Sequence, residues 1–302
     1  MQRYFTAVGF VVSSLLIAAC GGPTTAPTPG TGGGGGGGGG GVVEPVNATP
    51  AINSLTLKGT RANQPANFAD LGETIAVSAS VSDAETAVDQ LQYVWTSTAG
   101  SVTGTGANVT WKAPATAPAA SVGVTPASVT ITLTVIEKYG SAQQFQHSVS
   151  RTAEVALHDS VTEVGTMARQ FLLDFSDTNI KDADYVMRNF KAAACPQPSE
   201  VQAEREDVIR NYTFFRMQNF RIDLPTVTVN FGGSCPFRGK RGDACAVVGV
   251  YWDSIDLRDN SRAPNAGNDI VAAAYSATDR RWWLCASDYD GRNLLTGARI
   301  TR

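Results

Sequence analysis

The chain has 302 residues, a formal net charge of −3 and 43% apolar residues, which is enough material for two domains with ordinary cores. Its Lys and Arg residues are dispersed, so no basic stripe indicates a nucleic-acid-binding protein. Neither a Gly-x-Ser-x-Gly nucleophile elbow nor a phosphate-binding loop is present. The two histidines, His147 and His158, stand in no recognisable metal or nucleophile motif. The composition therefore favours a non-catalytic protein that uses neither a cofactor nor a metal.

Residues 1–19 have the order of a secretory signal: Arg3 near the start, then an uncharged, mostly apolar stretch that ends in small residues. Ile17-Ala18-Ala19-Cys20 resembles the lipobox of bacterial lipoproteins, and that resemblance implies that Cys20 carries acyl chains. The alternative is an uncleaved membrane helix, but the apolar run falls short of the ~20 residues that crossing a bilayer needs. Because Gly21 rather than Asp follows the cysteine, the resemblance favours the outer membrane of the cell envelope.

Residues 20–50 hold the lipidated cysteine and a tether with ten consecutive glycines, Gly32–Gly41. Glycine loses more backbone entropy on ordering than any other residue, so this segment is not expected to form a core. A flexible chain of this length spans about 30 Å on average. We expect it to hold the folded parts away from the membrane.

Residues 51–156 show the two-residue alternation of half-buried β-strands, with Gly and Pro between the strands. The alternating apolar positions are Ile75, Val77, Ala79, Val81, Leu91, Tyr93, Trp95, Val129, Ile131, Leu133 and Val135. Short strands at this spacing predict a β-sandwich. The acidic residues between two of these strands, Asp83, Glu85 and Asp89, are too few for a calcium site and are interpreted as a solvated loop.

The same stretch resembles polycystic kidney disease (PKD) and related immunoglobulin-like domains. The matching segments are Gly72-Glu73-Thr74-Ile75-Ala76-Val77, Leu91-Gln92-Tyr93-Val94-Trp95, Trp111-Lys112-Ala113-Pro114 and Ile131-Thr132-Leu133-Thr134-Val135. Glu137 departs from the pattern, since such domains often carry Asp there, and no cysteine pair joins the sheets. The resemblance implies an immunoglobulin-like sandwich with Trp95 in its core, and it implies no activity.

In the first part of residues 157–302, the apolar residues recur with the period of an α-helix. Ser160 and Glu163 form a candidate capping box for an amphipathic helix, and further helices are expected over 183–191 and from Ser199 to Tyr212. Strands are expected at 226–231, 244–255, 270–277 and 281–286, so the fold class predicted here is α+β. This order resembles the nuclear transport factor 2-like superfamily, in which a curved antiparallel sheet and helices form a cone. The resemblance implies either a binding site or an isomerase or dehydratase site inside the cone.

Four cysteines remain in the last part of the chain: Cys195, Cys235, Cys245 and Cys285. An even number in an exported protein favours two disulfides, whereas a zinc site usually has cysteines two to four residues apart. The short separation of Cys235 and Cys245 suits a hairpin and favours pairing Cys195 with Cys285, although the sequence does not exclude the other pairings.

No residue is predicted to be catalytic or to bind a metal. Tyr251, Trp252, Trp282 and Trp283 are candidates for lining a ligand pocket, with core packing as the alternative. We therefore expect a lipid-anchored envelope protein that binds an envelope protein, a glycan or a small apolar ligand without turnover. The two rival hypotheses are an envelope isomerase, dehydratase or hydrolase with its site in the cone, and an adhesion or spacer protein.

Overall fold

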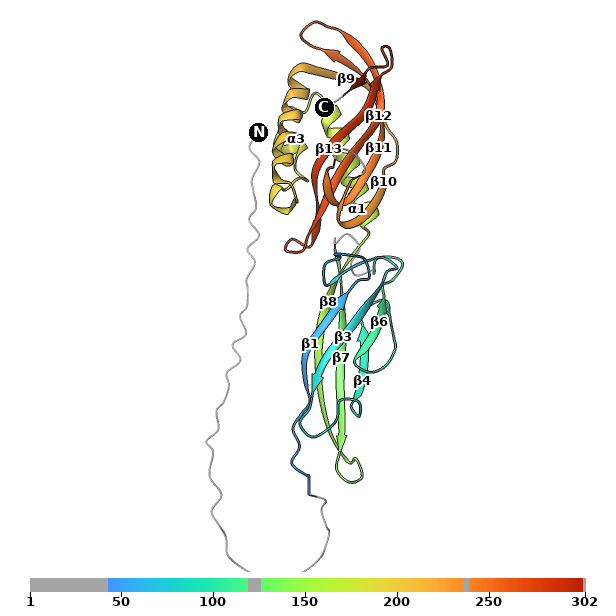
Figure 1. Ribbon diagram of the computed structural model, residues 1–302, viewed down its shortest axis with the longest axis vertical. Helices are drawn as coiled ribbons and strands as arrows, with labels where there is room; N and C mark the ends of the chain where they lie inside the picture. The colour runs from blue at the N-terminus through green and yellow to red at the C-terminus, as the bar shows by residue number, and fades with distance from the viewer. Residues whose placement is uncertain (1–42, 119–125, 236–238, 301–302) are drawn as a thin grey trace, which may run out of the picture. The chain divides into compact units, whose positions relative to one another are not determined.

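Eight strands build two four-stranded sheets in the first part of the computed structural model, which describes residues 43–118, 126–235 and 239–300 (Figure 1). The strands are β1 (Ala51–Lys58), β2 (Phe68–Asp70), β3 (Thr74–Ser82), β4 (Gln92–Ser97), β5 (Ser101–Thr103), β6 (Asn108–Lys112), β7 (Ala127–Tyr139) and β8 (Phe145–His158). Their order is β1–β3–β6–β5 in one sheet and β2–β8–β7–β4 in the other. Apart from the parallel pair of β2 and β8, neighbouring strands are antiparallel.

Apolar residues of both sheets share one core. Along β7, buried residues alternate with half-buried ones, because successive side chains of a strand point to opposite faces. The fully buried tryptophan of this core is Trp111, whose indole Nε1 donates a hydrogen bond to the carbonyl of Ala99 at 2.9 Å. Trp95, the tryptophan implied by resemblance, is only half-buried; its Nε1 donates to the carbonyl of Gly106 at 2.9 Å, so its polar edge lies at the rim of the core.

A second body of structure combines helices with a six-stranded antiparallel sheet (Figure 1). The helices are α1 (Ser160–Ser176), α2 (Ala183–Val186), η2 (Ala192–Ala194) and α3 (Pro198–Phe214); the strands are β9 (Phe215–Ile222), β10 (Thr226–Ser234), β11 (Arg241–Asp256), β12 (Arg262–Ser276), β13 (Arg281–Asn293) and β14 (Arg299–Ile300). The strand order is β10–β11–β12–β13–β14, and β9 pairs with the distal part of β11. The chain is thus a β-rich fold with several sheets.

The predicted helix after residue 157 is present as α1, but its capping differs from the sequence prediction. Asp159 is the N-cap, and its carboxylate accepts a hydrogen bond from the Thr162 amide at 3.1 Å. The Ser160 side chain, expected to be the cap, instead donates to Asp70. A partner distant in sequence has therefore replaced the local one. The strand β9 was not predicted at all.

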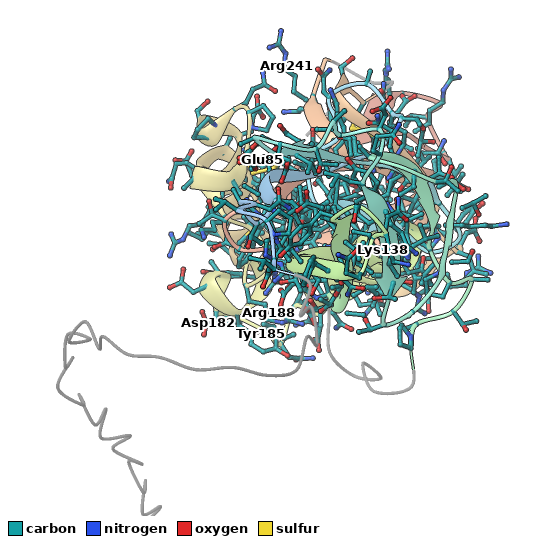
Figure 2. All side chains as sticks on the ribbon, turned by 90° about the horizontal axis from the view of Figure 1, so that it is seen from below. Glu85, Lys138, Asp182, Tyr185, Arg188 and Arg241 are labelled. Atoms are coloured by element: carbon teal, nitrogen blue, oxygen red, sulfur yellow. A yellow bond between two sulfur atoms is a disulfide. The ribbon has the colours of Figure 1, made fainter. Side chains whose placement is uncertain are left out.

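The helix predicted over 183–191 is the single turn α2. The Asp182 carboxylate caps it by accepting hydrogen bonds from the amides of Asp184 and Tyr185. The Arg188 guanidinium lies 4.2 Å from the centre of the Tyr185 ring, and Figure 2 shows these side chains together at the surface. Arg188 also donates to the buried carboxylate of Asp174 on α1, which ties this turn to the longer helix.

Two disulfides join Cys195 to Cys285 and Cys235 to Cys245, and these are the two pairings that the sequence favours. Cys285 is the extra residue of a bulge in β13, and its bond holds the segment before α3 against that strand. Cys245 points to the sheet face opposite Ala244 and Ala246, where it joins a small apolar cluster. Both faces of this sheet therefore carry buried apolar groups.

Phe68, on β2 of the first pair of sheets, belongs to the main hydrophobic core of the six-stranded sheet. The Phe68 side chain is fully buried and stacks on the His158 ring, with ring centroids 4.9 Å apart. The edges of Phe231, Tyr275 and Trp282 surround the Phe68 ring at centroid distances of 5.2, 4.8 and 6.2 Å. A residue far away in sequence thus completes the aromatic core of the second body.

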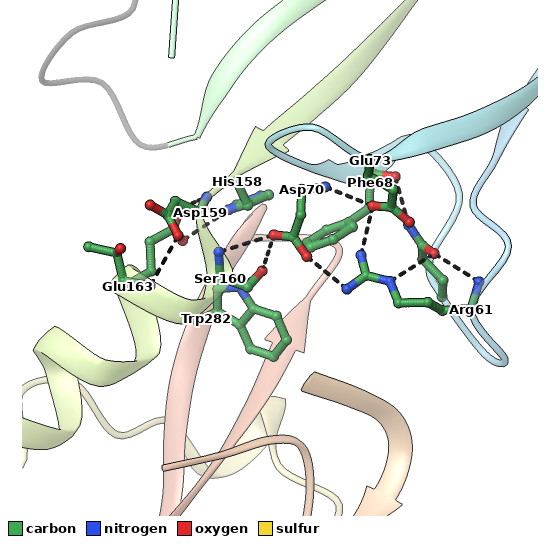
Figure 3. Close-up of polar contacts among 11 residues, drawn as sticks. Arg61, Phe68, Asp70, Glu73, His158, Asp159, Ser160, Glu163 and Trp282 are labelled. Atoms are coloured by element: carbon green, nitrogen blue, oxygen red, sulfur yellow. Dashed lines mark hydrogen bonds and ion pairs between the residues drawn. The ribbon is translucent and has the colours of Figure 1, made fainter. Parts of the chain in front are cut away.

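Hydrogen bonds surround this aromatic contact (Figure 3). The Asp70 carboxylate accepts a hydrogen bond from the Ser160 amide at 3.0 Å and from the Arg61 guanidinium at 2.7 Å. Arg61 donates a second bond to Glu73 at 2.8 Å, and the Trp282 indole donates to the Ser160 hydroxyl at 3.1 Å. Because β8 ends at His158 and α1 begins at Ser160, the sheets and the helix are joined without a linker.

Glu44–Arg302 form one compact unit. The predicted domain boundary between residues 156 and 157 falls inside β8. The predicted lipidation site Cys20 and the glycine run Gly32–Gly41 of the predicted tether lie outside the described residues, whereas residues 43–50 of that tether are described. Within the part of the chain that the structure describes, no helix is both long and apolar enough to cross a membrane.

Candidate functional site

A cavity of about 410 Å³ opens between the C-terminal half of α3, the end of α1 and the distal part of the six-stranded sheet. Its lining residues are Phe175, Asp207, Arg210, Asn211, Phe215, Met217, Trp252, Ser254, Asn265 and Tyr289. Small-molecule sites in proteins are typically concave, about 300–1,000 Å³ in volume and mostly apolar, with a few placed polar groups. The cavity meets each of these criteria.

The apolar walls come from strands as well as from α1. Met217 and Ser254 are paired residues of β9 and β11, so their side chains share the face that bears Trp252. The Trp252 ring meets the Tyr289 ring edge-on, with centroids 4.8 Å apart. This contact fixes the tryptophan, whereas the unbranched Met217 can adapt to the shape of a ligand.

Two asparagine side chains supply polar groups within the cavity. The Asn265 Nδ2 atom donates both of its hydrogens to the protein, to the Ser254 hydroxyl at 3.0 Å and to the Ala263 carbonyl at 2.9 Å. The Asn211 Nδ2 atom donates to the Phe175 carbonyl at 2.8 Å. These bonds hold the amide groups in place. For Asn265, the carbonyl oxygen is then the part of the side chain that remains for a ligand, and it acts only as an acceptor.

The charged groups beside the cavity are paired. Asp207, the carboxylate among the lining residues, forms an ion pair with Arg210 one helical turn away. Asp256, opposite Phe215 in the β9–β11 register, accepts side-chain hydrogen bonds from Arg258. Those bonds lower the pKa of Asp256 to about 2, so this carboxyl stays ionised at neutral pH. A general acid needs a pKa near the working pH, which Asp256 does not have.

The structure does not bring together the four aromatic residues predicted to line a pocket. Trp252 lines the cavity, and its neighbour Tyr251 points to the opposite sheet face, where it is 39% exposed. Trp282 is 1% exposed and packs in the core, while the Trp283 indole donates to Asp279 at 2.8 Å outside the cavity. Successive residues of a strand point to opposite faces, so Tyr251 lies outside the cavity that Trp252 lines, although both border a second hollow at the β9 edge. For Trp282, core packing is the observed role.

The cavity residues that the sequence analysis missed are mainly those of β9 and the two asparagines. Phe215 and Met217 alternate with Arg216 and Gln218, which is a two-residue period. That signal was available but follows directly on a helix, without a Gly or Pro break. Asn211 and Asn265 gave no sequence signal, because their role depends on partners in other elements.

The acidic loop between β3 and β4 is held by hydrogen bonds to the backbone. Asp83 accepts bonds from the amides of Glu85 and Thr86, and Glu85 accepts one from the Ala48 amide. Among the residues that the structure describes, no group of three or more His, Cys, Asp or Glu side chains is placed to hold a metal ion.

Comparison with protein-family models, curated proteins and solved structures finds no match to this chain. The functional argument therefore depends on the cavity and on the sequence.

Proposed function

We propose that the chain is a lipoprotein of the cell envelope, anchored in the outer membrane through Cys20, and that it binds a small, mainly apolar ligand without converting it. The cavity lined by Trp252, Phe215 and Met217 is the observation that carries the binding proposal. The lipobox-like segment and the glycine tether are the observations that support the proposed location at the membrane.

The proposal includes a finer description of the fold. The two four-stranded sheets would be an immunoglobulin-like sandwich related to PKD domains, because both contribute to one core. The helices and the six-stranded sheet would be a cone of the nuclear transport factor 2-like type, because α1 packs along the sheet and the cavity lies at its distal end. The strand order and the resemblances in sequence support both descriptions.

Binding without turnover is favoured by the chemistry of the cavity walls. A general acid or base must lie within hydrogen-bond reach of the substrate, with a pKa suited to proton transfer. The carboxylate that lines the cavity, Asp207, is held in an ion pair, and the asparagine amides do not titrate near neutral pH. An apolar pocket with fixed amides is suited to selecting a ligand by shape.

We expect Trp252→Ala to weaken the binding of N-phenyl-1-naphthylamine, a neutral apolar probe, by at least about tenfold. The substitution removes the largest apolar wall of the cavity. Fluorescence titration of Glu44–Arg302 measures the affinity. Tyr251→Ala, next in sequence and on the opposite sheet face, should leave the affinity unchanged. Equal effects of the two substitutions, or no saturable binding by the wild-type protein, would contradict a ligand site in the cavity.

We also expect the mature protein purified from membranes to begin at Cys20 and to carry acyl chains, which intact mass spectrometry would detect. Several acyl chains bind a membrane stably, since each buried methylene contributes about 0.8 kcal/mol. Cys20→Ala should give an unacylated protein. A wild-type protein recovered without acyl chains would disprove the anchor.

A further inference from the structure

Two shallow hollows adjoin each other at the edge of the six-stranded sheet, where β9 pairs with β11. They share Phe220, Arg221 and Tyr251. One extends to Arg169 and Leu173 on α1 and to Asp223. The other extends to Asn219, Trp252, Asp253, Pro264, Asn265 and Leu294, and thus borders the apolar cavity at Trp252 and Asn265. Their volumes are about 690 and 670 Å³. Because they share three residues, the two hollows together are here called the β9 groove.

The β9 groove offers an aromatic surface. The Tyr251 side chain is 39% exposed, although it lies in the middle of a long strand. The Arg221 guanidinium lies 5.6 Å from the centre of the Tyr251 ring, which holds the ring in place from one side. Phe220 is half-buried beside it and shared by both hollows. An exposed, fixed ring in a depression provides a flat apolar surface on which a ligand can stack.

The polar groups of the groove are balanced in charge and in hydrogen-bonding character. Arg169 and Arg221 supply donors, and no ion pair of either is found within the described residues. Asp223 and Asp253 supply acceptors. A hydroxyl group both donates and accepts, so a ligand rich in hydroxyls can use both kinds of group. A strongly anionic ligand would meet two carboxylates.

A β-bulge positions one of these polar groups. Arg221 pairs with Tyr251 and Gln218 pairs with Asp253, so β9 has one more residue than β11 in this interval. Asn219 adopts a positive φ of 52°, and its Nδ2 atom donates to the Asp253 carboxylate at 2.6 Å. Bulges commonly redirect side chains beside functional sites. Here the bulge fixes the orientation of Asp253.

We infer that the β9 groove binds a linear, uncharged glycan, whose sugar rings stack on Tyr251 and whose hydroxyls pair with Arg221, Asp253 and Asn219. Two adjoining hollows offer neighbouring positions for successive rings of a sugar chain. Trp252 and Asn265 border both the groove and the apolar cavity, whereas Tyr251 and Arg221 line the groove and not the cavity. Substitutions at Tyr251 and Arg221 therefore test the groove separately from the proposed cavity ligand.

Isothermal titration of the full-length, detergent-solubilised protein with the uncharged tetra-N-acetylchitotetraose tests the inference. We expect saturable binding, weakened at least about tenfold by Tyr251→Ala and by Arg221→Gln. Tyr251→Phe, which keeps the ring, should retain most of the affinity, and this variant separates stacking from misfolding. Arg205→Gln, which removes an arginine that pairs with Asp184 outside the groove, should have no effect.

The inference would be overturned by an absence of binding of tetra-N-acetylchitotetraose, by binding that Tyr251→Ala leaves unchanged, or by a preference for the acidic tetragalacturonate over tetra-N-acetylchitotetraose. Competition by anionic lipid vesicles for the same site would also contradict the inference. A bilayer surface does not enter a depression, so the glycan would then not be bound in the groove.

Discussion

Phe68→Ala is expected to lower the free energy of unfolding of Glu44–Arg302 by about 3–5 kcal/mol. The side chain is fully buried among His158, Phe231, Tyr275 and Trp282, and its removal leaves a cavity in the core of the second body. Although Phe68 lies on β2, we expect its substitution to destabilise the packing around Trp282 in the second body. Urea denaturation followed by tryptophan fluorescence and by circular dichroism measures the effect.

Two variants separate this contact from a general loss of apolar surface. Phe68→Leu keeps most of the buried volume and should cost clearly less than Phe68→Ala. Phe214→Ala removes the same type of side chain from a position that is 39% exposed and should cost about 1 kcal/mol or less. If Phe68→Ala were as mild as Phe214→Ala, the two bodies would not share a core in solution.

Replacing both Cys195 and Cys285 with Ala is expected to lower the free energy of unfolding by about 4–5 kcal/mol in the chain-entropy model, because their sequence separation is 90. Replacing Cys235 and Cys245, whose separation is 10, should cost about 3 kcal/mol. The bond between Cys195 and Cys285 closes the longer loop and therefore restricts the unfolded chain more.

Each double substitution avoids leaving a free thiol, and denaturation under non-reducing conditions gives both values. The ranking is the decisive feature: the pair Cys195 and Cys285 should be the costlier one. The opposite ranking would mean that native packing around Cys235 outweighs the entropy of the unfolded chain. Peptide mapping without reductant checks the pairing itself, and a link between Cys195 and Cys235 would contradict it.

The sequence by itself predicted the β-rich, multi-sheet character of the fold and the long helix after residue 157. The two-residue alternation over Val129–Val135 and the helical stripe after Leu157 are local patterns, and burial on one face of an element produces them directly. The cysteine separations likewise favoured the pairing that the structure contains. Each of these inferences needs only information carried by neighbouring residues.

Only the tertiary structure decided which side chains meet. Ser160 has the sequence of a helix cap but bonds to Asp70, and Phe68 has the sequence of a short edge strand but fills a distant core. The adjacent Tyr251 and Trp252 were predicted to line one pocket with Trp282 and Trp283, yet pleating points them to opposite faces. Trp252 lines the cavity and Tyr251 does not, although both border one hollow of the β9 groove. Contacts between segments far apart in the chain leave no local pattern, so the geometry of the candidate site could not be read from the sequence.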